Sequence, residues 1–307
     1  YSVDMDTAEQ KDTRAEWLAK RAGDVTSTEI SALFDLSPYM TRYELWHRKK
    51  NRLIVDGETS ERMKWGLRLQ ESIAQGIAED QGWMIRRMDE YMRLPDLRMG
   101  ASFDYAIGDD GILEVKNVDS LIFKEGWIED GDGLEAPPHI ELQVQHQLAT
   151  SNRKWAVIGA LIGGNRVVLI RRERSESIIE AIRGRVAEFW ASIEVGQEPE
   201  PLWERDATFI AKLYGYAEPG KVIDGDDEIS QLAAEYRSIS QEQKKTEAIR
   251  DGLKARLLTK MGDAEKVKGE KYTISAGLVG PAHVEYDRAG YRAFRIVWKR
   301  KGEQKGE

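Results

Sequence analysis

Three ionisable residues combine in a pattern that could carry hydrolytic chemistry. Asp104 ends one apolar, strand-like run, while Glu114 and Lys116 lie two residues apart in the next run and so share one face of that strand. An Asp and a Glu brought together across a hairpin can hold a hard divalent cation, and a neighbouring Lys can orient or help to deprotonate a metal-bound water. Because Glu-x-Lys pairs are also common on strand surfaces, the spacing alone leaves a purely structural role equally open.

Two other polar groups give weaker signals. His139 and His146 lie seven residues apart on one helical face, too far apart to share an ion without further ligands, and we expect both histidines to be solvated. The neighbouring glutamines predict a polar helix face: Gln143, Gln145 and Gln147.

The composition narrows the class of protein. With 307 residues, 41% hydrophobic and 33% charged, the chain can bury one substantial core with an appendage, or two modest domains. The absence of Cys excludes thiolate sites, so a metal would need oxygen or imidazole ligands. P-loop, dinucleotide-fingerprint and serine-hydrolase motifs are missing. No apolar run could span a bilayer, and we expect a cytoplasmic protein with no membrane partner.

Hydrophobic spacing predicts the elements that must position the triplet. An apolar stripe with i, i+4 spacing predicts a helix over about 58–81. Beyond Gly82 the spacing of apolar residues falls toward two, which predicts strands over 83–88, 99–105 and 111–118. The last two of these strands carry the acidic residues, and a tight turn makes them a hairpin.

The next segment is predicted to add a loop, two more strands and two helices that pack on the sheet. Residues 120–138 are acidic and rich in glycine, and we expect a mobile loop there. A helix over 139–150 precedes two apolar strands over 155–162 and 166–170, whose continuous hydrophobicity indicates burial on both faces, and a helix over 175–195 follows. This order predicts an α/β fold in which helices flank a mixed central sheet.

Pro199 and Pro201 mark a boundary, which predicts a core over 1–204 and an accessory region over 205–307. Residues 1–205 hold 27 Lys and Arg against 37 Asp and Glu, whereas the remainder holds 19 against 17, so the net charge turns from −10 to +2. The basic remainder favours phosphate contacts or assembly, with a packing appendage as a nearly equal alternative. It would contain a long helix or helical hairpin and short strands, over 229–261, 272–275 and 293–298.

Five pieces of the sequence then follow one another in a recognisable order between residues 15 and 195. They are 21–30 with 36–39 and 43–46, Trp65-Gly66 with Gln70-Glu71, 101–104, 113–116, and 143–145. Together these pieces resemble the YqaJ-type viral recombinases, the group that includes phage lambda exonuclease. Each piece alone is weak, but their order favours the functional interpretation of the triplet.

The resemblance implies a PD-(D/E)XK nuclease fold with a C-terminal helical and β appendage. It also implies a magnesium-dependent enzyme, with Mn²⁺ as a substitute, that digests the 5′-ended strand of double-stranded DNA and leaves 3′ overhangs for a single-strand annealing partner. Asp104 and Glu114 would be metal ligands, with the Val115 carbonyl completing the shell. Lys116 would position the attacking water, and Gln143 would support the metal or the scissile phosphate.

The resemblance also implies a pocket for a DNA end. Arg21 and Thr28 fall where the family holds the terminal 5′ phosphate, which suits a guanidinium and a hydroxyl donor. The alternatives are a surface charge for Arg21 and a residue in a helix's first turn for Thr28. The expected setting is a bacterial host cell carrying a phage or prophage. The oligomeric state stays open, including a ring of identical chains.

One position departs from the family pattern. The family's glutamate, four residues after Gly66, is replaced here by Gln70, with Glu71 next to it. Adjacent helical residues point about 100° apart, so Glu71 can take that place only if the helix is rotated or bulged. A neutral amide could still hold a metal-bound water, which leaves the number of metal ions open. Two alternatives to an exonuclease therefore stand: a same-fold endonuclease and a weakly active or inactive module that binds DNA ends.

Overall fold

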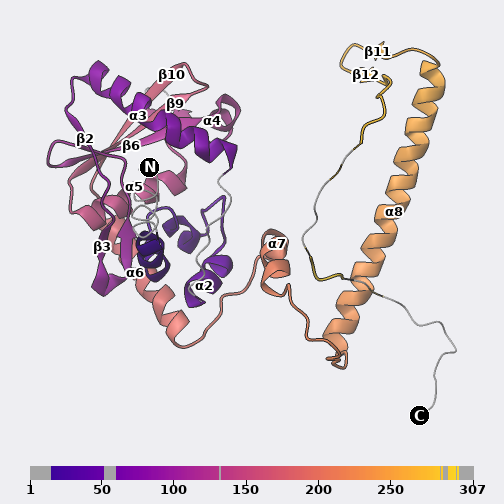
Figure 1. Ribbon diagram of the computed structural model, residues 1–307, viewed down its shortest axis with the longest axis horizontal. Coiled ribbons are helices and arrows are strands. Elements are labelled where there is room, and N and C mark those ends of the chain that lie inside the picture. The colour runs from indigo at the N-terminus through magenta and orange to yellow at the C-terminus, as the bar shows by residue number, and fades with distance from the viewer. Residues whose placement is uncertain are drawn as a thin grey trace, which may run out of the picture. The chain divides into compact units, whose positions relative to one another are not determined.

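The computed structural model describes residues 15–51, 60–130, 133–283, 285, 290–294 and 296. Its internal contacts divide the chain into two units, Tyr1–Ile210 and Ala211–Glu307 (Figure 1). Helix α7 (Trp203–Leu213) begins within the first unit, because its buried Asp206 accepts hydrogen bonds from the Thr41 hydroxyl at 2.5 Å and from the Leu202 N–H at 2.8 Å. The first unit thus extends past residue 204.

A five-stranded mixed sheet forms the centre of the first unit, in the order β10-β9-β6-β5-β2. β5 and β6 form an antiparallel hairpin, β6 runs parallel to β9, and the outer strands β10 and β2 are antiparallel to their neighbours. These strands are β2 (Ile85–Arg87), β5 (Tyr105–Ile107), β6 (Gly111–Val118), β9 (Trp155–Ile162) and β10 (Arg166–Glu173).

Helices cover both faces of this sheet (Figure 1). Ile112 of β6 lies in one buried cluster with Val144 of α5 (Pro138–Ser151), whereas the next residue, Leu113, lies in another with Ile77 of α3 (Glu61–Gln81). Because successive strand residues point to opposite faces, α5 and α3 lie on opposite sides of the sheet. The α/β fold class predicted from the sequence, a mixed sheet flanked by helices, is confirmed.

The predicted strand over 99–105 is divided between two sheets. Its first part is β4 (Met99–Ala101), the middle strand of a small sheet between β1 (Val25–Thr26) and β3 (Met92–Leu94). Its second part is β5 in the main sheet. Residues 102–104 therefore bridge two sheets, and this break frees the side chain of Asp104 from the regular alternation of a strand.

The short N-terminal helices are set by local capping. The Thr41 side chain accepts a hydrogen bond from the Glu44 N–H at 3.0 Å and begins α2 (Arg42–Lys50), as its capping-box spacing predicts. The 3₁₀ helix η1 (Ile30–Phe34) has no side-chain cap. It packs in one cluster with α6 (Glu176–Glu194) on the far side of α5.

The prediction of a mobile loop over 120–138 is wrong. Asp119 caps α4 (Ser120–Gly126), and β7 (Ile128–Asp130) then pairs with β8 (Gly133–Glu135). The buried rings of Phe123 and Trp127 stack with centroids 5.5 Å apart, so two aromatic side chains hold this segment to the core. β10 is also more exposed than predicted, because it is an edge strand of the main sheet.

The second unit is built on one helix. α8 (Asp227–Met261) is a single helix of 35 residues, which settles the alternative of a helical hairpin, and the Asp226 side chain caps it by accepting from the Ile229 N–H at 2.7 Å. A two-stranded hairpin follows, β11 (Lys266–Lys268) with β12 (Thr273–Ser275). The strand predicted over 293–298 falls partly outside the described residues, and 293, 294 and 296 lie in no strand. Within the described ranges, no helix combines the length and apolarity needed to cross a bilayer.

Candidate functional site

Asp104 lies where β6 loses its neighbour. β5 pairs with β6 only as far as Leu113, so the Val115 N–H faces an open edge and donates instead to the Asp104 carboxylate at 2.7 Å. Within a strand, the N–H and C=O of one residue point to the same edge. The Val115 carbonyl is therefore directed toward the same open edge as Asp104.

Glu114 points from the same strand toward α5, where it is 4% exposed. One of its carboxylate oxygens accepts from Gln143 Nε2 at 2.6 Å and from Lys116 Nζ at 2.6 Å. Its other oxygen accepts from Gln147 Nε2 at 2.8 Å. Gln143 and Gln147 are four residues apart, so one face of α5 presents both amides to the carboxylate.

The remaining polar contacts join these groups into one cluster. Lys116 Nζ also donates to Gln143 Oε1 at 3.1 Å. From α3, Gln70 Nε2 donates to the second oxygen of Asp104. The structure thus brings together the predicted residues Asp104, Glu114, Val115, Lys116, Gln143 and Gln70, from β6, α5, α3 and the bridge before β5.

The charges of this cluster are unbalanced. Burial, reinforced by the nearby Glu114 carboxylate, raises the pKa of Asp104 to about 7. Burial would lower the pKa of Lys116, but the carboxylates of Glu114 and Asp104 outweigh it and raise that pKa above its usual value. Lys116 is thus an ammonium beside the Glu114 carboxylate, and the Asp104 carboxyl takes up a proton as the pH falls through about 7.

This donor set fits a hard divalent cation. Two carboxylates and a backbone carbonyl are oxygen ligands of the kind that Mg²⁺ and Mn²⁺ accept, with waters completing the shell. Among the described residues, no group of three His, Cys, Asp or Glu side chains could hold a metal, and the α3 side chain that reaches Asp104 is the neutral amide of Gln70. Within the described part of the chain, the charged ligands of the cluster are thus the carboxylates of Asp104 and Glu114.

The structure does not bring Glu71 to the cluster. Its side chain is exposed, and its charge acts on Arg87 and Tyr105 instead. α3 is a regular helix through this point, so Glu71 points about 100° away from Gln70. The structure therefore does not bring Glu71 together with the other candidate catalytic residues.

Arg21 and Thr28 lie on a neighbouring surface. The Arg21 guanidinium lies over the Trp17 ring at 4.5 Å from the centroid, and Trp17 Nε1 donates to Ser102 Oγ at 3.3 Å. Ser102 is two residues before Asp104, so Trp17 connects Arg21 to the strand bridge that carries the cluster. Thr28 is exposed, with its hydroxyl 3.2 Å from that of Thr26.

A buried ion pair between Lys49 and Glu29 holds the backbone of Arg21. Lys49 Nζ lies 2.8 Å from a carboxylate oxygen of Glu29 and donates to the Arg21 carbonyl at 2.8 Å. Burial raises the pKa of Glu29, but Lys49 outweighs it and leaves that pKa below its usual value. The pKa of Lys49 is lowered by the same burial. The Arg21 backbone is thus held by a rigid contact while its guanidinium stays on the surface.

Sequence reasoning missed part of the support. The glutamines at 143, 145 and 147 were predicted to form a polar helix face, yet all three are buried: 7%, 4% and 0% exposed. His146 is also buried, not solvated, and its Nε2 lies 3.1 Å from the Gly100 carbonyl oxygen. The i, i+4 spacing of Gln143 and Gln147 was the available signal, because it places both amides over Glu114.

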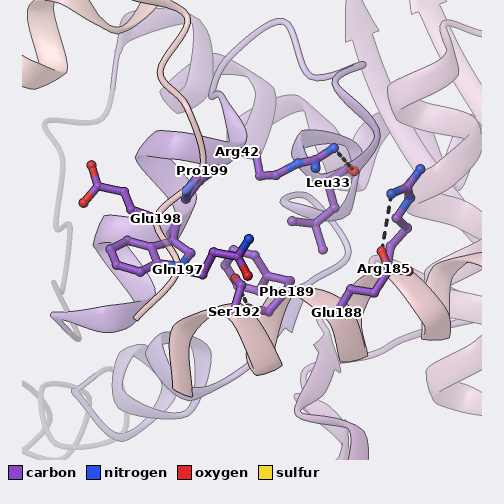
Figure 2. A pocket seen from close by; sticks show the side chains of 10 residues that line it. Leu33, Arg42, Arg185, Glu188, Phe189, Ser192, Gln197, Glu198 and Pro199 are labelled. Carbon is purple, nitrogen blue, oxygen red and sulfur yellow. Dashed lines mark hydrogen bonds and ion pairs between the residues drawn. The ribbon is translucent and has the colours of Figure 1, made fainter. Parts of the chain in front are cut away.

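A separate cavity of about 230 Å³ lies between η1, α2 and α6 (Figure 2). Arg42 donates across it to the Leu33 carbonyl at 2.9 Å, and Arg185 pairs with Glu188 at 3.4 Å. None of the predicted site residues lines this cavity, so it is distinct from the carboxylate cluster.

Comparison with known protein families matches the segment of the chain that contains this cluster. Residues 16–154 match the YqaJ-like viral recombinase domain, and this segment contains every residue of the cluster. Over this segment the chain is similar to the YqaJ-like viral recombinase domain. The matched segment includes both the cluster and the residues Arg21 and Thr28.

Relatives of this chain have been described in bacteria. The uncharacterized protein YqaJ of Bacillus subtilis (strain 168) is 27% identical over 259 residues, covering 82% of this chain and 80% of that protein. An alkaline exonuclease from Laribacter hongkongensis is 21% identical, with a TM-score of 0.49; the match covers 64% of this chain and 100% of that chain. A phage related exonuclease from Haemophilus somnus 129PT is 11% identical, with a TM-score of 0.40; the match covers 54% of this chain and 80% of that chain.

Proposed function

We propose that this protein is a metal-dependent exonuclease that degrades the 5′-ended strand of linear double-stranded DNA. Its product would be a 3′ overhang, the substrate of a single-strand annealing protein in homologous recombination. The observation that carries the proposal is the Asp104, Glu114 and Lys116 cluster at the open edge of β6, inside a recombinase domain. Both the cluster and the family support a DNA exonuclease.

Asp104, Glu114 and the Val115 carbonyl would hold Mg²⁺, with Mn²⁺ as a substitute. The bound ion would supply Lewis-acid stabilisation of the charge that develops on the phosphate. Asp104 is fixed by the Val115 N–H and by Gln70, and Glu114 by two amides of α5. The two carboxylates are thus oriented before an ion or substrate arrives, which lowers the cost of assembling the site.

Lys116 would orient the water that attacks phosphorus. Its raised pKa keeps it protonated, so it acts as a hydrogen-bond donor and positive charge near the phosphate and does not remove a proton itself. Gln143 would position Lys116 from α5, because its amide bonds both Lys116 and Glu114.

Arg21 and Thr28 would bind the terminal 5′ phosphate. A guanidinium stacked on Trp17 and an exposed hydroxyl are suitable donors for phosphate oxygens. The Trp17 to Ser102 contact connects Arg21 to the strand bridge of Asp104. An enzyme that recognises the end there would work from the 5′ terminus of one strand.

One observation favours a second candidate, a module that binds DNA ends with little or no cleavage. Gln70 replaces the family's glutamate and donates to Asp104, so the chain offers fewer negative charges to a second ion. Weak metal binding would leave the surface of Arg21 intact while slowing hydrolysis.

A single gel separates the candidates. Linear and covalently closed forms of one plasmid are incubated with the protein in Mg²⁺ and, in parallel, in Ca²⁺, which commonly binds such sites without supporting turnover. The exonuclease proposal predicts loss of linear DNA in Mg²⁺ alone, with the closed circle intact. Cutting of the closed circle would indicate an endonuclease. Retarded linear DNA that is not degraded in Mg²⁺ would indicate the end-binding module.

A further inference from the structure

Tyr39 is an aromatic side chain that the structure leaves in water. It is 82% exposed and lies on the short loop over 35–41, between η1 and α2. Covering an aromatic ring stabilises a fold, so a ring left in water forgoes that contribution. A single exposed side chain is nevertheless common on protein surfaces. The rigidity of this loop and the surroundings of the ring therefore decide whether Tyr39 is a binding group.

Hydrogen bonds hold the loop of Tyr39 in one conformation. The buried Ser37 hydroxyl accepts from the Tyr39 N–H at 3.2 Å, which closes a local turn. α7 fixes the same loop at both ends. Arg205 donates to the Ser37 carbonyl at 2.7 Å, and Asp206 accepts from the Thr41 hydroxyl at 2.5 Å. The backbone that carries Tyr39 is thus held from two directions while the ring stays exposed.

The Tyr39 ring lies beside the carboxylate and lysine cluster. It packs edge-on against the His139 ring, with centroids 5.7 Å apart and ring planes at 89°. His139 lies in the first turn of α5, four residues before Gln143, so the two side chains share one face of the helix. Gln143 in turn bonds both Lys116 and Glu114. Neighbouring side chains therefore connect Tyr39 to the cluster.

Electrostatic effects agree with this position of the two rings. Burial, and then the charge of Lys116, lower the pKa of His139. Burial and the two carboxylates have the largest effects on the pKa of Lys116, and the Tyr39 phenol adds to its rise. Because such effects weaken with distance, both rings lie near the ammonium that is proposed to orient the attacking water.

We propose that Tyr39 stacks on a nucleobase of the DNA strand whose phosphate occupies the cluster, with His139 supporting the edge of the ring. This subsite rests on the proposed nuclease function and adds to it a contact with the base beside the scissile phosphate. Each phosphate carries a base through one sugar, so a phosphate near Lys116 brings a base to the loop of Tyr39. A ring held in place before DNA arrives loses little conformational freedom on binding.

Stacking of this kind needs no particular base sequence. Every base has a π face, so one aromatic ring serves each nucleotide that reaches the cluster in turn. Within a duplex, the neighbouring bases cover both faces of an internal base, so a base reaches Tyr39 only after it has left the stack. The subsite therefore binds an unstacked nucleotide, which distinguishes it from contacts to the phosphate itself.

The fluorescent base 2-aminopurine, which dims when it stacks, tests this contact without cleavage. It replaces the first or the second base of the 5′-phosphorylated strand of a linear duplex, bound to the full chain in Ca²⁺, while the anisotropy of a distant dye reports binding. At one of these positions the base should be several-fold brighter with Tyr39→Leu than with the unmodified protein, because leucine has no π face. Tyr39→Phe should restore the dim signal. A 2-aminopurine deep in the duplex should report no difference among the three proteins.

In Mg²⁺, Tyr39→Leu should raise KM for linear DNA about tenfold and change kcat less, whereas Tyr39→Phe should keep the unmodified KM. Tyr216→Leu is the matched control, since Tyr216 is 78% exposed and lies in the second unit. Equal 2-aminopurine signals for Tyr39→Leu and the unmodified protein, with DNA bound by both, would overturn the subsite and leave the nuclease proposal standing. Dimming that depends on Tyr39, without cleavage in Mg²⁺, would support the subsite and contradict the nuclease proposal alone.

Discussion

Glu114 is a buried carboxylate that neutral amides hold in place. Gln143 and Gln147 donate hydrogen bonds to it without adding positive charge. Lys116 supplies the one positive charge of the cluster, while Asp104 adds a second negative charge. The cluster is therefore built to orient its carboxylates and still attract a cation, which distinguishes it from an ordinary buried salt bridge.

Separate measurements of metal binding and of cleavage should distinguish the role of the two carboxylates from that of the lysine. Asp104→Asn and Glu114→Gln keep size and one oxygen but lose the charge, so Mg²⁺ affinity should fall about tenfold or more in calorimetry. Lys116→Met should keep that affinity and lose cleavage by about a hundredfold or more, because an ammonium is not a ligand. Lost metal affinity in Lys116→Met, with the fold intact by circular dichroism, would contradict the role given to Lys116.

Gln70 sets the number of charges at the site. Gln70→Glu adds a third carboxylate beside Asp104, so Mg²⁺ affinity should rise by about tenfold while the metal-free protein becomes less stable through like-charge repulsion. Glu71→Gln is the matched control, since its exposed side chain points away and the change should alter neither property. Equal affinities in Gln70→Glu and the unmodified protein would show that position 70 does not face the ion.

Arg21 should determine the preference for a phosphorylated end. Linear DNA with 5′ phosphates should be digested about tenfold faster than the same DNA with 5′ hydroxyls, the size of a charge-assisted hydrogen bond, and Arg21→Ala should remove most of that difference. Lys20→Ala, an exposed neighbouring charge, should leave the ratio unchanged. A ratio near one in the unmodified protein would remove the end pocket from the account.

At the scale of elements, α5 links the cluster to the stability of the fold. Its His146 donates Nε2–H to the Gly100 carbonyl, while Nδ1 is buried with no partner among the described residues. Burial lowers the pKa of His146 to about 4, although Glu29 and Asp24 oppose this shift. A protonated His146 would bury an N–H with no acceptor, so the native state excludes the proton that the unfolded chain accepts.

Stability should therefore fall as pH drops from about 6.5 to 4, because the unfolded state binds more protons over that window. The loss from His146 between pH 7.5 and pH 5 should be about 2 kcal/mol in the free energy of unfolding. His146→Gln keeps a donor for Gly100 and removes the titration, so its stability should depend less on pH by that amount. Parallel curves for both proteins in denaturant titrations would assign the acid sensitivity to other groups.

The elements with strong periodicity were predictable from the sequence. α3 and β9 appear within a few residues of their expected bounds, because a single hydrophobic period runs through each. The folded segment at α4, β7 and β8 was not predictable, since its order depends on Phe123 and Trp127 reaching a core formed by distant strands. The glutamines of α5 were misjudged for the same reason: local polarity does not reveal a buried carboxylate on another strand.

At the scale of the whole molecule, the candidate catalytic residues and the long helix α8 lie in different units. Every residue proposed for cleavage or end binding lies between Arg21 and Gln143 in the first unit, within the segment that matches the YqaJ-like viral recombinase domain. α8 lies outside the matched segment, in the second unit.

The most direct test of the nuclease account follows one strand of a linear duplex with a 5′-phosphate, labelled at either its 5′ or its 3′ end, in Mg²⁺. The account predicts early release of the 5′ label as small products and gradual shortening of the 3′-labelled strand, with neither change in Asp104→Asn. Digestion by Asp104→Asn at the rate of the unmodified protein, or release of the 3′ label first, would contradict it.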